Sequence, residues 1–157
     1  MKDEKTYEEI STDLIQLISE FHKVISPIFK KDLNDNYGLN KNQVRVMMII
    51  GRSNEITPTV LGRCMDMEKG SLTTLIGSLE ELKLVYRKDD PKDKRKVLLY
   101  LTSKGKEYFY EQEEKFKKKI EEIFSSLSEK EFVSFKESLD TIIKQSEGGL
   151  VWIVQNN

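Results

Sequence analysis

The chain of 157 residues has few of the side chains that build disulfides, metal sites or imidazole-dependent active sites. It contains one cysteine, Cys64, and one histidine, His22, so it cannot form an intrachain disulfide and lacks the ligands of the usual structural zinc sites. It also lacks a glycine-rich phosphate loop and a nucleophile with a placed base, and neighbouring acids such as Glu80 and Glu81 have no partner group. These absences predict a protein that is not an enzyme and that binds no metal or cofactor.

Long apolar runs are missing as well. No stretch approaches the roughly 18 residues that a membrane-spanning helix needs, and the first ten residues are charged, without the apolar centre of a signal peptide. Hydrophobic residues still make up 38% of the chain and recur along all of it, which suits a folded core rather than a disordered chain. We therefore expect a cytoplasmic protein without membrane contact.

The net charge of -1 hides an uneven distribution. Residues 83–106 contain nine Lys or Arg and three Asp, whereas residues 107–147 contain eleven acids and seven bases. Local basic patches matter more for nucleic-acid binding than the total charge does. The first segment is therefore a candidate for contact with a negatively charged partner, although a charge run by itself is more often a solvated loop.

Apolar residues at helical spacing predict a first helix over 6–32. Pro27 marks a kink or break near its end, and a turn is expected at 34–38. The side chains expected to face inward on this helix are Tyr7, Ile10, Leu14, Leu17, Ile18, Phe21, Ile25 and Ile28.

Capping signals place the next two helices. A second helix begins after Asn40, which forms a capping box with Gln43, and Val44, Met47, Met48 and Gly51 make its inward stripe. A short third helix begins after Thr57, with Pro58 at its first position. Cys64 in this helix is expected to be a small buried residue.

A fourth helix and a hairpin follow. Leu72, Leu75, Ile76, Leu79 and Leu82 form one apolar stripe on the fourth helix. Residues 85–89 and 96–102 are rich in strand-forming residues, and the turn "DPKDK" joins them into a hairpin with a charged tip.

Two more helices complete the chain. Thr102 caps a long helix through about residue 125, and Ser128 with Glu131 caps a last helix that Gly148 and Gly149 end near residue 147. The side chains expected to face inward on these helices are Phe109, Phe116, Ile120, Ile123, Phe124, Leu127, Phe132, Phe135, Leu139, Ile142 and Ile143.

The order of elements predicts a helix-turn-helix followed by a hairpin, which is a winged helix. With the motifs in the wing, the whole chain resembles the MarR-type (multiple antibiotic resistance regulator) transcription factors. The residues that match the family's pattern D-x-R…L-x-L-T-x-x-G, with its usual Arg and Pro, are Asp93, Arg95, Leu99, Leu101, Thr102, Gly105, Arg87 and Pro91.

Two positions depart from the family. Lys83 stands where the family has the glycine that ends its recognition helix, and a positive φ there costs about 1 kcal/mol relative to Gly. Thr74 stands where a family member often has arginine.

The resemblance implies a mainly α fold with a small β-hairpin wing, with N- and C-terminal helices that form a dimerisation region. The expected divisions are an N-terminal dimerisation helix over 1–36, a winged helix-turn-helix DNA-binding region over 37–104, and C-terminal dimerisation helices with a tail over 105–157, all within one structural domain.

On the fourth helix, the side opposite the apolar stripe carries small residues. Each interior glycine costs roughly 1 kcal/mol of helix stability relative to Ala, which a plain scaffold helix has little reason to accept on its solvent face. A helix that enters the major groove gains close backbone approach from small side chains. The expected recognition residues are Lys69, Gly70, Ser71, Thr73, Thr74 and Gly77. Because hydroxyls discriminate bases weakly, part of the specificity is expected from DNA shape.

The hairpin tip is the second expected DNA contact. Arg95 suits a narrow minor groove, where negative potential is concentrated, and the resemblance assigns Asp93 the role of holding it. The expected wing contacts are Arg87, Lys88, Lys92, Asp93, Lys94, Arg95 and Lys96.

The terminal helices have more apolar surface than one small winged helix needs, so we expect a homodimer on a near-palindromic operator in double-stranded DNA. The apolar tail Leu150–Val154 either straps across the partner or docks on its own subunit. The resemblance also implies a repressor relieved by a small aromatic or lipophilic effector, bound at a junction for which the candidates are His22, Tyr37, Met47, Met48 and Arg52. The alternative function is a winged-helix protein-interaction module without DNA binding.

Overall fold

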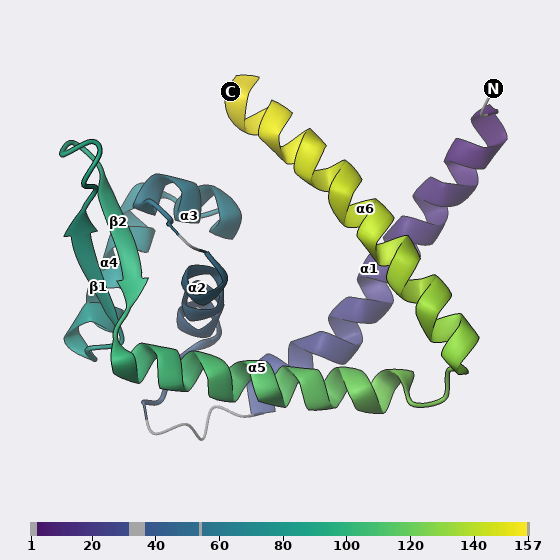
Figure 1. Ribbon diagram of the computed structural model, residues 1–157, viewed down its shortest axis with the longest axis horizontal. Coiled ribbons are helices and arrows are strands. Elements are labelled where there is room, and N and C mark those ends of the chain that lie inside the picture. The colour runs from purple at the N-terminus through teal and green to yellow at the C-terminus, as the bar shows by residue number, and fades with distance from the viewer. Residues whose placement is uncertain (1–2, 32–36, 54, 157) are drawn as a thin grey trace. The chain divides into compact units, whose positions relative to one another are not determined.

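The computed structural model describes the backbone of residues 3–31, 37–53 and 55–156, and their side chains except at 25, 27–31 and 146–156. Two compact units divide the chain between Phe116 and Lys117. The first contains α1 to α4, both strands and the first part of α5, and the second contains the rest of α5 and α6 (Figure 1). The expected mainly α fold with one hairpin is confirmed.

Helix α1 spans Glu4–Lys31, and Pro27 does not end it. The side chains of Ile25 and Ile28 and most of the turn expected at 34–38 lie outside the described residues. Within the described part of α1, Tyr7, Ile10, Leu14, Leu17 and Ile18 are all exposed, so the inward face expected of this helix is not covered by its own unit.

Helices α2 (Lys41–Arg52) and α3 (Pro58–Met65) begin where their caps predict. The Asn40 side chain accepts from the backbone N–H of Asn42 and Gln43, and the Gln43 side chain accepts from the backbone N–H of Asn40, which completes the capping box. The Thr57 hydroxyl accepts from the N–H of Val60 at 3.3 Å. Polar side chains thus satisfy backbone donors that the first turns of both helices leave without intrahelical partners.

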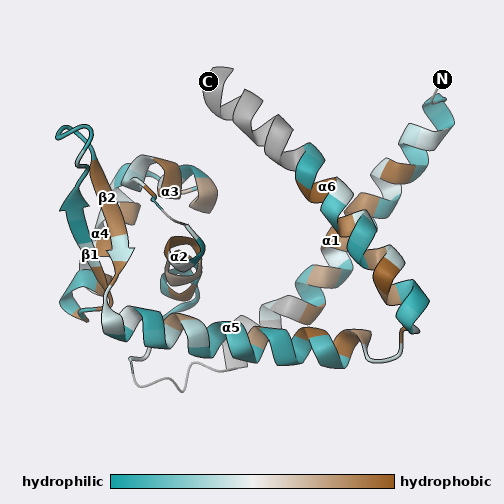
Figure 2. Ribbon diagram, viewed as in Figure 1, coloured by the Kyte–Doolittle hydropathy of each residue, from teal (hydrophilic) through white to brown (hydrophobic). Residues whose placement is uncertain are grey.

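Helix α4 (Lys69–Glu81) leads into the two-stranded antiparallel sheet of β1 (Val85–Asp89) and β2 (Val97–Leu101). Figure 2 shows β2 mostly hydrophobic and β1 mostly hydrophilic, in agreement with their burial. The register pairs Val85 with Leu101, and an isolated bridge joins Leu99 to Ile56 on the other edge of β2. The hairpin therefore has its base at the core and its tip in solvent.

The core of this unit lies between α2, α3, α4, the sheet and the start of α5 (Ser103–Phe124). Close packing of α2 on α5 requires glycine at position 51, because an added Cβ would lie 2.3 Å from the Phe109 ring. The Thr102 hydroxyl accepts from the N–H of Gly105, which confirms the cap of α5. The fully buried centre contains Leu39, Val46, Met47, Leu61, Ile76, Leu79, Leu84 and Leu99.

In the second unit, α6 spans Glu129–Asn156 behind the Ser128 and Glu131 capping box, which is confirmed. The expected stop at Gly148 and Gly149 is wrong, because the helix continues through both residues and takes in the backbone of the tail 150–154. The side chains of that tail lie outside the described residues.

Several expectations of burial are wrong. Cys64 is exposed, since the inward face of α3 runs through Leu61 and Met65, and Cys64 lies beside that face. Leu82 follows the last residue of α4 and is 36% exposed. On α6, Phe132, Ile142 and Ile143 are about half exposed within their unit. Within the described residues, no helix combines the length and the apolar character needed to cross a membrane.

Candidate nucleic-acid interface

The outer face of α4 presents small side chains. Of the recognition residues expected from the sequence, Lys69, Gly70, Ser71, Thr73 and Thr74 are exposed and Gly77 is half-buried. A Cβ added at Gly70 or Gly77 would meet no heavy atom within 4 Å, so packing within the described chain does not require glycine at either position. The glycines lower the profile of this face without serving the core.

The threonine hydroxyls on this face are engaged with their own helix. Thr73 donates to the carbonyl of Lys69 at 2.7 Å, and Thr74 donates to the carbonyl of Gly70 at 3.2 Å. With its single proton used, each hydroxyl offers only lone pairs to an incoming group, next to a methyl. The face can therefore accept hydrogen bonds and make apolar contacts.

A cavity of about 570 Å³ opens between α3 and the start of α4. Its lining carries both signs of charge, with Arg63 and Lys69 as the bases and Asp66 and Glu68 as the acids. Glu68 precedes α4 but makes no side-chain hydrogen bond to its first turn. The start of α4 therefore combines a basic side chain with two carboxylates, which sequence periodicity alone did not single out.

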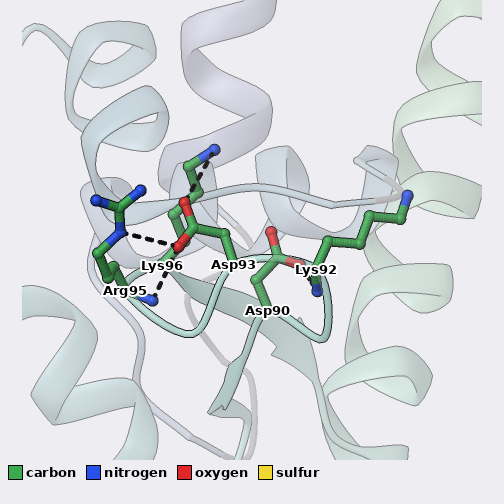
Figure 3. Close-up of polar contacts among 5 residues, drawn as sticks. All are labelled: Asp90, Lys92, Asp93, Arg95 and Lys96. Atoms are coloured by element: carbon green, nitrogen blue, oxygen red, sulfur yellow. Dashed lines mark hydrogen bonds and ion pairs between the residues drawn. The ribbon is translucent and has the colours of Figure 1, made fainter.

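The hairpin tip is organised around the carboxylate of Asp93 (Figure 3). Its Oδ1 accepts from the backbone N–H of Arg95 at 3.1 Å and from Arg95 Nε at 3.2 Å, and Oδ2 lies 3.8 Å from Lys96 Nζ. These contacts, led by the Arg95 side chain, lower the pKa of Asp93 below its ordinary value of 3.8. The carboxylate stays ionised and fixes the arginine from the side of Nε.

Arg95 remains open to solvent despite this contact. Its side chain is 91% exposed, and its terminal Nη groups make no hydrogen bond within the described residues. A second carboxylate shapes the same turn, because Asp90 accepts from the backbone N–H of Lys92 at 2.8 Å. The tip thus presents one oriented guanidinium on a turn held by two aspartates.

The remaining basic residues of the wing differ in how free they are. Arg87 on β1 lies 3.4 Å from Glu80 on α4, an ion pair that the sequence did not predict and that joins the helix to the strand. Lys88, Lys92 and Lys94 are exposed and form no ion pair with any described residue.

Known proteins are similar to this region in both sequence and fold. A sequence model described as "MarR family" matches residues 37–96. The regulator SarR of Staphylococcus aureus, an HTH-type transcriptional regulator, is 30% identical over 80 residues that cover 50% of this chain and 70% of SarR. The chain belongs to the MarR family.

Two further comparisons extend this membership. YkoM of Bacillus subtilis, named an uncharacterised HTH-type transcriptional regulator, is 28% identical over 100 residues, and the chain spans 64% of its length. FabT of Streptococcus pneumoniae, solved in complex with DNA, superposes with a TM-score of 0.67 at 22% identity over 90% of this chain and 98% of FabT. The superposition on FabT shows that this chain has the MarR fold.

The five effector candidates of this MarR family member differ in their surroundings, and none of them lines the cavity beside α4. Met47 and Met48 are buried in the core, and Tyr37 packs edge-on against Tyr108 with ring centroids 5.9 Å apart. Arg52 binds Glu113 at 2.8 Å, and His22 is exposed on α1. The cavity beside α4 is lined by other residues.

Proposed function

We propose that the protein is a dimeric, sequence-specific DNA-binding transcriptional regulator. The observation that carries the proposal is the exposed Arg95 at the wing tip, which Asp93 orients within the same compact unit as the small-residue face of α4. Membership of the MarR family and the names of its relatives, which are transcriptional regulators, support the same function. The DNA in the FabT structure supports the choice of partner.

The recognition helix is proposed to enter the major groove with its small face. Gly70 and Gly77 allow the backbone of α4 to approach the base edges closely. Thr73 and Thr74 then act as acceptors toward the amino groups of cytosine or adenine, and their methyls contact thymine methyls. Lys69 at the start of the helix contacts a phosphate, because backbone donors and the helix dipole favour anions there.

The wing is proposed to place Arg95 in the adjacent minor groove. A narrow minor groove concentrates negative potential and attracts arginine, and the bond from Nε to Asp93 leaves the Nη groups free to enter it. Flanking phosphates are contacted by Lys88, Lys92, Lys94 and Lys96. Arg87 keeps its ion pair with Glu80 and also contacts a phosphate.

Dimerisation is proposed to cover the apolar faces of the terminal helices. Tyr7, Ile10 and Ile18 of α1 are 58%, 48% and 68% exposed, which is unusual for large apolar side chains repeated along one helix. A two-fold dimer presents two recognition helices to two half-sites of a near-palindrome. Light scattering that gives the mass of a monomer at micromolar concentration would remove the dimer from the proposal.

The finer proposal is a repressor relieved by a small aromatic or lipophilic effector. It rests on the family resemblance, and His22, Tyr37, Met47, Met48 and Arg52 stay its candidate residues. Because Met47 and Met48 are core residues, an effector that touches them has to open the packing of α2. Release of bound DNA by a panel of phenolic acids tests this part, and no release by any of them contradicts it.

DNA titration at fixed salt tests the function itself. Arg95→Ala is expected to weaken binding to a duplex selected by the wild-type protein by about 1–3 kcal/mol. Lys104→Ala is the control that is matched in charge, since Lys104 is exposed in the first turn of α5, which follows the base of the hairpin and not its tip. It is expected to change affinity by less than about 0.5 kcal/mol.

Salt dependence separates this function from the alternative. Phosphate contacts give a steep loss of affinity with rising salt. A wild-type protein that shows no such slope, or an Arg95→Ala variant that binds like Lys104→Ala, contradicts the DNA interface and favours a winged-helix interaction module.

A further inference from the structure

The Thr102 side chain links the turn that follows α4 to the first turn of α5. Its hydroxyl donates to the carbonyl of Lys83 at 2.6 Å and accepts from the N–H of Gly105 at 3.0 Å. Its own backbone N–H donates to the carbonyl of Leu84 at 3.0 Å. One residue thus binds the turn that follows the recognition helix and the first turn of the next helix.

The turn held by this contact is strained. Lys83 has φ of 58°, in the left-handed region that favours glycine and that other residues rarely adopt. An unfavourable backbone conformation persists where its surroundings fix it. The hydroxyl bond to the Lys83 carbonyl is one such restraint, and the bond from the N–H of Leu84 to the carbonyl of Leu79 is another.

The same junction leaves no room for adjustment on the α5 side. A Cβ at Gly105 would lie 2.0 Å from the carbonyl oxygen of Leu84, so the first turn of α5 packs directly on the backbone that follows α4. Main-chain atoms therefore pack directly at the junction of α4 and α5, and the Thr102 hydroxyl adds a side-chain hydrogen bond across it.

We propose that Thr102 is a positioning residue for DNA reading, because its hydroxyl fixes the end of recognition helix α4 against the start of α5. The role rests on the proposed DNA-binding function. A hydroxyl has one donor and two lone pairs, and here the donor serves one helix and a lone pair serves the other. Valine has the same shape and can do neither.

An ordinary helix cap offers the contrast. Asn40 caps α2 by accepting from Asn42 and Gln43, both in its own helix. Loss of the Asn40 side chain lowers stability but removes no direct hydrogen bond to another element. Loss of the Thr102 hydroxyl also releases the carbonyl of Lys83, so the direction of α4 relative to the wing and α5 becomes less defined.

The test compares Thr102→Val, Thr102→Ser and Asn40→Ala with the wild-type protein on two probes. One probe is a duplex selected by the wild-type protein from a random library, and the other is a scrambled duplex of equal length. Thr102→Val is expected to lower the ratio of the two affinities by about tenfold, which corresponds to a lost hydrogen bond in a partly buried site. Thr102→Ser should restore the ratio, and Asn40→Ala should leave it unchanged although it lowers the thermal midpoint.

Hydrogen exchange provides a readout that does not need DNA. Thr102→Val should speed exchange of the Leu82–Leu84 amides, and Thr102→Ser should not. If Thr102→Val keeps both the affinity ratio and the exchange of these amides, the positioning role is wrong. If the wild-type protein selects no duplex, the proposed function fails, and exchange alone decides whether Thr102 fixes the turn.

Discussion

The lobe of residues 37–116 and the terminal helices α1 and α6 carry apolar residues at similar helical spacing, but only the lobe buries them. All the buried hydrophobic residues that the structure describes lie between Leu39 and Phe109. On α1 and α6, side chains such as Ile18 and Ile143 are 68% and 50% exposed within their own units. Periodicity therefore identifies the apolar face of a helix, but the element that covers this face depends on the rest of the fold or on another chain.

A Leu→Ala substitution in the lobe and one in α1 are expected to differ most in how far they lower the free energy of unfolding. Leu79→Ala in α4 should lower the free energy of unfolding by about 2–5 kcal/mol at every protein concentration, because Leu79 is fully buried in its own lobe. Leu14→Ala in α1, where the side chain is 40% exposed, should cost less at low concentration and more when the proposed dimer forms. Urea unfolding at two protein concentrations measures both, and equal losses for both variants at both concentrations contradict the comparison.

The lobe and α6 also differ in where they use glycine, and this difference is expected to have the next largest effect on the free energy of unfolding. The lobe has lysine at position 83, where φ is positive, whereas α6 continues through two glycines at 148 and 149 that a helix disfavours. Lys83→Gly should therefore raise the free energy of unfolding by about 1 kcal/mol.

The matched variant for this prediction is Asp66→Gly. Asp66 also has positive φ, at 51°, but aspartate tolerates the left-handed region better than lysine does. Denaturant unfolding should give it the smaller gain. A Lys83→Gly protein no more stable than the wild-type protein contradicts the strain at this turn.

The smallest expected difference concerns two carboxylates, one in each unit. Hydrogen bonds from Arg95 lower the pKa of Asp93 below 3.8, and hydrogen bonds from Ser128 lower the pKa of Glu131 below 4.5. Because both pKa values are lowered in the folded protein, each contact is intact above the ordinary value and is lost as the pH falls through the lowered one.

Carboxyl NMR titration checks the assignment of each shift. Arg95→Ala should return the pKa of Asp93 toward 3.8 and leave Glu131 unchanged, and Ser128→Ala should do the reverse. An Asp93 titration that is the same with and without the Arg95 side chain shows that the guanidinium does not hold this carboxylate.

Local signals in the sequence were sufficient for the elements of the lobe. The capping box of Asn40 and Gln43, the cap at Thr57 and the strand over 85–89 all lie where the sequence places them. Each depends on residues within a few positions of one another, so neighbouring side chains decide the conformation. The contact between Asp93 and Arg95 was expected from the resemblance to the family, and the structure forms it.

Contacts between distant elements were not predictable in this way. The pairing of Arg87 with Glu80 and the bond from Thr102 to Lys83 require the relative placement of α4, the hairpin and α5. The expected burial of Cys64 was wrong because a short helix with a narrow inward face leaves residues beside that face exposed. The stop at Gly148 was wrong because glycine lowers helix stability without forbidding the helix. The DNA-contact roles of α4 and the wing stay predictions.

The two strands of the hairpin differ in how many of their edges are hydrogen-bonded to a neighbour. Strand β2 has β1 on one side and the bridge to Ile56 on the other, while β1 pairs only with β2 in the described part of the chain. An open strand edge is a template for aggregation, and charged side chains on it oppose pairing with a second molecule. Arg87, Lys88 and Asp89 supply those charges on β1. The basic residues proposed to hold DNA thus also keep the wing from adding a foreign strand, so selection for solubility and selection for DNA affinity act on the same side chains.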